Sequence, residues 1–170
     1  MNFLRAVLDG LMMAVSFNAL AAFLVLVNPR YFFDSYPKSI QRAAPQGMTP
    51  DEKRVNQIFT VIVLPALLVY GAVSSWQTGM KDFGSLFLAG YIHWILVNFG
   101  DFFFLDILLF QKLPDRVAIP GTEGHRDYRL GNWMKVIGLL EHLVLWPFVL
   151  VPLFALLETA IAKGLLFLPG

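Results

Sequence analysis

Four long apolar stretches constrain the fold of this chain more than any other feature of its sequence. They cover residues 3–28, 56–76, 83–112 and 132–157. A helix needs about 20 apolar residues to cross the hydrocarbon of a bilayer, and each stretch is long enough. With 57% hydrophobic residues, the chain has more apolar side chain than a soluble domain of its length can bury. The sequence therefore predicts an all-α polytopic membrane protein, an antiparallel bundle of four transmembrane helices in one domain over residues 1–170.

Basic residues are distributed unevenly over the predicted loops. Ten Lys and Arg residues lie in or next to the two longer loops, residues 29–55 and 113–131. The opposite side carries only Arg5, Lys81 and Lys163. Loops rich in Lys and Arg stay in the cytoplasm. We therefore expect both long loops to be cytoplasmic and both termini to lie outside. The ten residues are Arg30, Lys38, Arg42, Lys53, Arg54, Lys112, Arg116, Arg126, Arg129 and Lys135.

Asp101 and His142 are the polar residues that stand out inside the spans. Counting helical rise places both roughly 7 Å to the cytoplasmic side of the bilayer midplane. Ionisable groups at such a depth cost several kcal/mol and normally face a bundle interior or a wet cavity. We expect the Asp101 carboxylate to accept a hydrogen bond from the His142 imidazole, as the catalytic core of a site that transfers protons or orients a metal-bound or anionic substrate. The alternative is a structural hydrogen bond between two helices.

Further polar residues fall on the same side of the predicted bundle. They lie at the cytoplasmic ends of the third and fourth spans or in the two loops, and together they could roof a polar cavity. We predict that they form the mouth of the site and contact a substrate. These residues are Arg30, Asp34, Asn98, Asp106, Glu123 and Glu141.

The spacing of Asp101 and Asp106 bears on a comparison with membrane prenyltransferases, whose aspartate-rich motifs bind magnesium diphosphate. Five residues turn about 140° on a regular α-helix, so the two aspartates are predicted to point apart. Asn98 and Asp101 share a face. The second acidic motif of those enzymes is absent, and the chain is too short for their helix count. The spacing therefore argues against a prenyltransferase site.

Two histidines on different spans raise the alternative of a bis-histidine haem. Axial ligation requires both imidazoles at nearly one depth, whereas helical rise separates His93 from His142 by about 11 Å. We therefore expect His93 to be a satisfied polar residue beside Trp94. Asp9 and Glu158 fall near the outer ends of their spans and are expected to lie at the membrane interface.

The absence of cysteine excludes several kinds of chemistry. A chain with no cysteine has no disulfide, no thiolate metal site and no cysteine nucleophile. The sequence identifies no cofactor and leaves the presence of a metal open.

Two loop motifs, "NPRYFFDSYPKSIQ" and "IPGTEGHRDY", resemble those of a group of small bacterial integral membrane proteins. Those proteins combine an N-P-R…D-Y-P…I-Q loop, an acid-bearing third span and an I-P-G-T-E-G loop. Here the D-Y-P element carries an inserted serine, Ser35. The resemblance implies a multi-pass protein of the bacterial cytoplasmic membrane and implies no activity. The matching positions are Asn28, Pro29, Arg30, Asp101, Asp106, Gly121, Thr122, Glu123 and Gly124.

Three classes of function are consistent with these features. The first is a membrane enzyme or binding protein whose cytoplasm-facing polar cavity takes a lipid-soluble or lipid-linked substrate. The second is a non-catalytic subunit of a larger membrane complex, favoured by the apolar first span. The third, an ion-translocating unit, needs polar residues leading outward from Asp101, and only Asn18 and His93 offer them. We expect the lipid bilayer as the main partner, a membrane protein or a second copy of the chain as candidate partners, and no nucleic acid.

Overall fold

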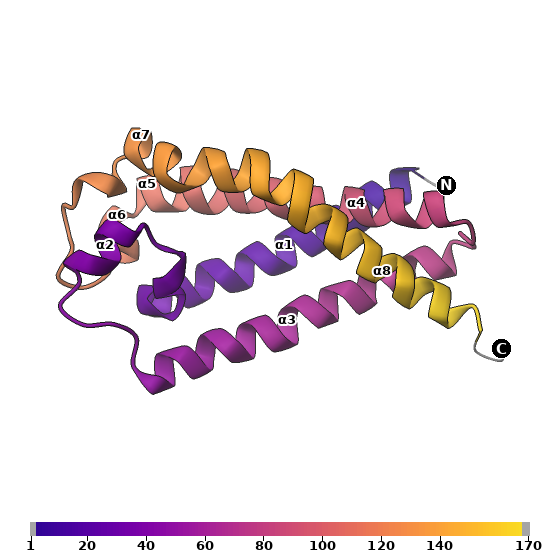
Figure 1. Cartoon of the computed structure of the whole chain (residues 1–170), viewed down its shortest axis with the longest axis horizontal. Helices are drawn as coiled ribbons and strands as arrows, with labels where there is room; N and C mark the ends of the chain where they lie inside the picture. The colour runs from indigo at the N-terminus through magenta and orange to yellow at the C-terminus, as the bar shows by residue number, and fades with distance from the viewer. Residues whose placement is uncertain (1–2, 168–170) are drawn as a thin grey trace.

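Four helices of the described chain are long and apolar enough to cross a membrane. The structure is a computed structural model, and it describes residues 3–167. The four helices cover Phe3–Val27, Pro50–Gln77, Phe83–Lys112 and Leu130–Leu165. Figure 1 shows them packed as one elongated bundle, which confirms the predicted all-α fold class.

The first two long helices are regular, whereas the third and fourth change type along their length. The first two are α1 (Phe3–Val27) and α3 (Pro50–Gln77). The third consists of α4 (Phe83–Gly100), the π-helical segment η2 (Asp101–Leu109) and α5 (Phe110–Lys112). The fourth consists of α7 (Leu130–Trp133), the π-helical segments η4 (Met134–Gly138) and η5 (Glu141–Leu150), and α8 (Val151–Leu165).

The two long connections gather at one end of the bundle, and the described ends of the chain lie at the other (Figure 1). The first connection contains η1 (Pro29–Ser35) and α2 (Lys38–Ala43). The second contains α6 (Pro114–Val117) and η3 (Arg126–Tyr128). We call this end of the bundle the loop end, and the opposite end the terminal end.

The fourth helix crosses the bundle obliquely. It lies beside the third helix at the loop end and beside α3 at the terminal end (Figure 1), and α8 contacts both α4 and α3. Close approach to α4 is possible because Gly90 has no side chain. A Cβ at this position would lie 3.1 Å from the Cα of Ala155. The helix also continues to Leu165, beyond the predicted end at residue 157.

Large apolar side chains cover the outside of the bundle. Val61 and Phe148 are examples, with 70% and 74% of their surfaces exposed. Water would penalise so much exposed apolar surface, whereas lipid chains accept it. The outer surface therefore agrees with a protein embedded in a membrane.

A layer of buried apolar side chains divides the interior of the bundle. It is formed by Met13, Ala14, Leu67, Trp94, Val97, Trp146 and Val151. We call it the middle layer. Along each long helix it separates polar residues towards the loop end from polar residues towards the terminal end.

Candidate functional site

A cavity of about 200 Å³ opens at the loop end of the bundle. Its walls come from α1, the third and fourth helices, and the η1 connection. Most of the lining is aromatic or aliphatic: Phe17, Ala21, Val25, Phe32, Tyr36, Leu105, Phe110, Trp133, Ile137 and Trp146. The polar lining consists of Ser35, Asp101, Asp106, Glu141 and His142. The cavity thus combines an apolar wall with three carboxyl groups and one imidazole.

Asp101 and Asp106 line the same cavity because they belong to a π-helix. The segment η2 runs from Asp101 to Leu109, and a π-helix joins residues five apart by its hydrogen bonds. Residues five apart therefore lie on nearly one face. The prediction that the two aspartates point apart is wrong, because it assumed the 3.6-residue turn of an α-helix.

The fourth helix shows the same spacing on the opposite wall of the cavity. Ile137 and His142 are five apart, as are Glu141 and Trp146, and all four line the cavity. The π-helical segments η4 and η5 contain these residues. Single π-turns inside α-helices are rare and frequently mark functional sites. Here π-helical segments on two neighbouring helices border one cavity.

His142 contacts Asp106 rather than the predicted partner, Asp101. Its Nε2 lies 3.1 Å from Oδ2 of Asp106, which is ion-pair distance without the alignment of a hydrogen bond. Its Nδ1 lies 2.7 Å from Oδ1 of Asn98, and the Asn98 amide nitrogen donates to the backbone oxygen of His142 at 3.0 Å. The catalytic pair predicted from the sequence is therefore replaced by a triad of Asn98, His142 and Asp106.

Asn98 determines which ring nitrogen of His142 carries a proton. The backbone oxygen of His142 can only accept, so it orients the Asn98 amide and leaves Oδ1 of Asn98 to accept from Nδ1 of His142. Neutral histidine carries one ring proton, and this one is then on Nδ1. A second proton on Nε2 would make His142 an imidazolium, for which the Asp106 carboxylate at 3.1 Å is the counter-ion.

Asp101 and Glu141 complete the polar part of the cavity. Both line it, from η2 and η5 respectively. Neither forms an ion pair with any Lys, Arg or His within residues 3–167. Glu141 also borders a second hollow, which shares Ser35, Tyr36 and Ile137 with the cavity. This second hollow continues the cavity towards the loops.

Arg30 does not reach the cavity, contrary to the prediction. Its Nε donates to Glu52 at 2.7 Å, and its other nitrogens donate to the backbone oxygens of Gln46 and Gly47. Glu52 in turn accepts from the backbone N–H of Thr49 at the start of α3. The buried guanidinium is fully used in tying the first connection to α3.

Neither Asp34 nor Glu123 lines the cavity. Asp34 is exposed and borders the second hollow. Glu123 is exposed in another depression, formed by the second connection, and its carboxylate accepts from the backbone N–H of Gly121. Backbone hydrogen bonds from Glu123 itself and from Gly121 lower the pKa of this carboxyl. The prediction that Glu123 contacts the substrate is wrong for this cavity, because the carboxylate is held within its own turn.

Tyr36 is a site residue that sequence reasoning missed. Its hydroxyl donates to the backbone oxygen of Val117 at 2.6 Å, which joins the two connections over the cavity. Burial raises the pKa of this phenol well above its usual value, and neighbouring Tyr128 adds to the shift. The mixture of aromatic and basic residues around Tyr36 is typical of a segment in the lipid headgroup zone and gives no sign of a cavity. No local signal shows that Tyr36 packs edge-on against Trp133.

Trp133 also lines the cavity and has an unsatisfied donor. The residue is 3% exposed, and its indole nitrogen has no hydrogen-bond partner in the part of the chain that the structure describes. A buried donor without an acceptor costs about 1–3 kcal/mol. The cavity is therefore suited to hold a polar atom from outside the chain that accepts a hydrogen bond from this indole.

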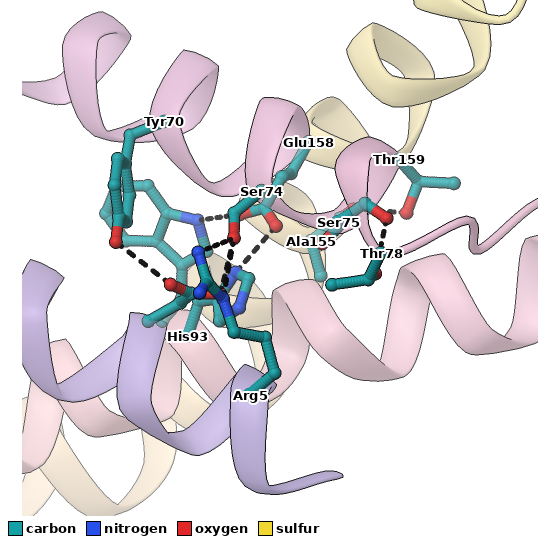
Figure 2. Close-up of polar contacts among 11 residues, drawn as sticks. Arg5, Tyr70, Ser74, Ser75, Thr78, His93, Ala155, Glu158 and Thr159 are labelled. Atoms are coloured by element: carbon teal, nitrogen blue, oxygen red, sulfur yellow. Dashed lines mark hydrogen bonds and ion pairs between the residues drawn. The ribbon is translucent and has the colours of Figure 1, made fainter. Parts of the chain in front are cut away.

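A second polar cluster lies near the terminal end and was not predicted (Figure 2). Glu158 is 1% exposed; one carboxylate oxygen lies 2.7 Å from Nδ1 of His93, and the other accepts from the indole N–H of Trp94. The prediction that Glu158 is interfacial is wrong, because the fourth helix continues past it and α3 and α4 cover it. The expectation that His93 is satisfied holds for Nδ1 only, since Nε2 has no hydrogen-bond partner among the described residues.

Asp9 belongs to the same end of the bundle and is also buried. It is 4% exposed, pairs with Arg5 at 2.9 Å, and accepts from the hydroxyls of Tyr70 and Ser74. The prediction of an interfacial Asp9 is therefore wrong. The spacing of Arg5 and Asp9, four residues apart on a helix, is the signal that could have shown a paired acid.

Residues 3–167 contain no group of three or more His, Asp or Glu side chains arranged to hold a metal ion. Comparison with known proteins gives no name to the site. No family model, no curated protein and no solved structure matches the chain.

Proposed function

We propose that this protein is an integral membrane enzyme or binding protein that takes a lipid-soluble or lipid-linked substrate into the cavity at the loop end. The distribution of basic residues supports a cytoplasmic loop end with both termini outside. On this proposal the cavity opens towards the cytoplasmic leaflet of a bacterial inner membrane.

The observation that carries the proposal is the His142–Asp106 pair within a mostly apolar cavity. Asn98 fixes the ring of His142, whose Nε2 lies 3.1 Å from Oδ2 of Asp106. An imidazole positioned this way can give a proton to, or take one from, an oxygen or nitrogen atom of a bound substrate. Exclusion of water by the aromatic wall strengthens each electrostatic contact to that atom.

The size of the cavity supports a ring or headgroup as the part that binds. A volume of about 200 Å³ is comparable to the ~150 Å³ cavity known to hold benzene, and smaller than the ~300–1,000 Å³ of sites for drug-sized ligands. The remainder of a longer molecule would extend through the second hollow beside Glu141. Such a molecule could reach the site from the bilayer.

The test is to identify what the protein retains on purification. We expect mass spectrometry of the protein in lipid nanodiscs to detect a small molecule that is absent from empty nanodiscs. Asp106→Asn and His142→Ala should lower its occupancy, whereas Glu123→Gln, outside the cavity, should not. The proposal would be overturned if the wild type and all three variants retained the molecule equally, and if Asp106→Asn and His142→Ala also fully complemented a deletion strain.

The alternative is a non-catalytic subunit of a larger membrane complex. The exposed apolar face of α1, which includes Leu4, Leu8, Met12 and Val15, favours it. This function requires a stable protein partner and no ligand in the cavity. Isolation in native lipid discs, followed by mass measurement, separates the two functions.

A further inference from the structure

We infer that the substrate of this cavity carries a positive charge, and that its class is a lipid-soluble amine or quaternary ammonium compound. The inference rests on the proposed function, because it assumes that a substrate binds in the cavity. It adds the charge and chemical class of that substrate.

The first support is the balance of charge inside the cavity. An imidazolium at His142 is balanced by the Asp106 carboxylate, whose Oδ2 lies 3.1 Å from Nε2. Asp101 and Glu141 are then left over, and no Lys or Arg of the described chain lines the cavity. Carboxyl groups within an apolar wall must either hold protons or face a cation. A cationic substrate gives one of these two carboxylates a partner, and the other can keep its proton.

The second support is the aromatic content of the wall. Six rings line the cavity, at Phe17, Phe32, Tyr36, Phe110, Trp133 and Trp146. Aromatic faces attract cations, and cages of such rings recognise quaternary ammonium groups. Aromatic rings alone would accept any apolar molecule, but rings together with unpaired carboxylates favour a cation.

The third support is the second hollow, through which a substrate would pass. Its charged lining includes Asp34, Asp127 and Glu141 against one amine, Lys38. Asp127 already accepts from Ser39 and lies 3.7 Å from Nε of Arg126. The other two carboxylates, Asp34 and Glu141, outnumber the one amine of this lining, which favours the entry of cations.

The indole N–H of Trp133 needs a hydrogen-bond acceptor, which the substrate could supply. Its N–H is buried beside the cavity without a partner in the described chain. A water molecule or a substrate oxygen next to the charged nitrogen would satisfy it. An amine bearing a nearby hydroxyl or carbonyl oxygen would supply both the charge and this acceptor.

Binding of a cation should be linked to proton release. The groups that face the cavity are Asp101 and Asp106 on η2, Glu141 and His142 on η5, and Tyr36 from the first connection; α1 contributes only apolar side chains. Asp101 or Glu141, if protonated, has to lose its proton to pair with a monovalent cation. Cation affinity should therefore rise with pH, and a neutral ligand should show no such dependence.

The experiment compares benzyltrimethylammonium with its uncharged isostere, 2,2-dimethylpropylbenzene, by titration calorimetry of the full chain in nanodiscs. We expect the cation to bind about ten-fold more tightly, with a heat that depends on the ionisation enthalpy of the buffer because protons are released. Asp101→Asn with Glu141→Gln should abolish this preference. Asp101→Glu, which keeps the charge, should retain it, and Glu123→Gln should leave it unchanged.

Two results would overturn the inference. If the isostere binds as tightly as the cation, the cavity takes an apolar substrate, and the proposed function stands without the charge. If the preference for the cation survives in the double variant, the carboxylates do not recognise it. Circular dichroism and gel filtration confirm that the variants are folded, and retention of the isostere shows that their cavity is intact.

Discussion

Glu158 lies where the side chain of residue 71 would be. A Cβ built on Gly71 of α3 would come within 2.5 to 2.8 Å of the Glu158 carboxylate oxygens. Since the same carboxylate holds His93 and Trp94 of α4, this one acid joins α3, α4 and α8.

Gly71→Ala should therefore destabilise the protein, because the methyl group displaces the buried carboxylate. Replacement of a helical glycine by alanine normally stabilises by about 0.5–1 kcal/mol. Gly164→Ala is the matched control, since a Cβ there has nothing within 4 Å. Thermal unfolding in detergent should show a lower midpoint for the first variant and an unchanged or higher one for the second. A stabilised Gly71→Ala protein would contradict the packing.

Glu158→Leu should be more damaging than Glu158→Gln. Leucine leaves the ring of His93 and the N–H of Trp94 without an acceptor, and breaking a buried pair costs about 3–5 kcal/mol. Glutamine keeps one acceptor oxygen. Thermal unfolding gives the ranking, and equal midpoints for the two variants would show that the polar contacts carry little stability.

Arg30→Ala should lower stability by about 1–3 kcal/mol, because Glu52 loses its charged partner but keeps the hydrogen bond from the backbone N–H of Thr49. Arg30 does not line the cavity, so retention of the native small molecule should be unchanged in the folded fraction. Mass spectrometry after equal recovery of folded protein checks this. If the Arg30→Ala protein were as stable as the wild type but lost the bound molecule, Arg30 would belong to the binding site after all.

Tyr36 should make stability depend on pH in the alkaline range. Burial raises the pKa of Tyr36 in the folded protein above the value of 10.0 of an exposed phenol. The contribution is complete below pH 10 and is lost as pH rises towards the folded-state pKa, because the unfolded chain ionises first. The unfolding midpoint of the wild type should fall more between pH 9 and 11 than that of Tyr36→Phe. Parallel curves would contradict the assignment.

Asn98→Leu should disturb the proton at His142 as well as stability. The variant leaves Nδ1 and the backbone oxygen of His142 unpaired, which costs about 1–3 kcal/mol. It also removes the group that fixes the ring tautomer. Nitrogen-15 NMR of labelled histidine should show one fixed Nδ1–H or an imidazolium for His142 in the wild type, and a tautomer mixture in the variant. An unchanged His142 signal would show that Asn98 does not set the tautomer.

The membrane helices could be predicted because length and apolar composition determine them almost alone. Asp101 and His142 were also recognisable, since an ionisable residue deep in an apolar stretch stands out in any sequence. The pairing of His142 with Asp106 was not, because it depends on the π-helical geometry of η2. No residue of η2 marks that geometry in the sequence.

The position of Glu158 was missed for a different reason. The predicted fourth span ended at residue 157, one position earlier, so the acid was assigned to the interface. In the structure the helix continues to Leu165. The structural role of Arg30 was missed because its partner, Glu52, lies 22 positions away. In the sequence, Glu52 is recognisable only as part of a helix cap.

The middle layer separates the two ends of the bundle with respect to proton exchange. On α4 it places Trp94 and Val97 between His93 and Asn98, and on the fourth helix it places Val151 between His142 and Glu158. Protons cross a membrane protein along polar side chains or water, and an apolar layer offers neither. His142 should therefore exchange protons with the solution at the loop end and not with the solution at the terminal end.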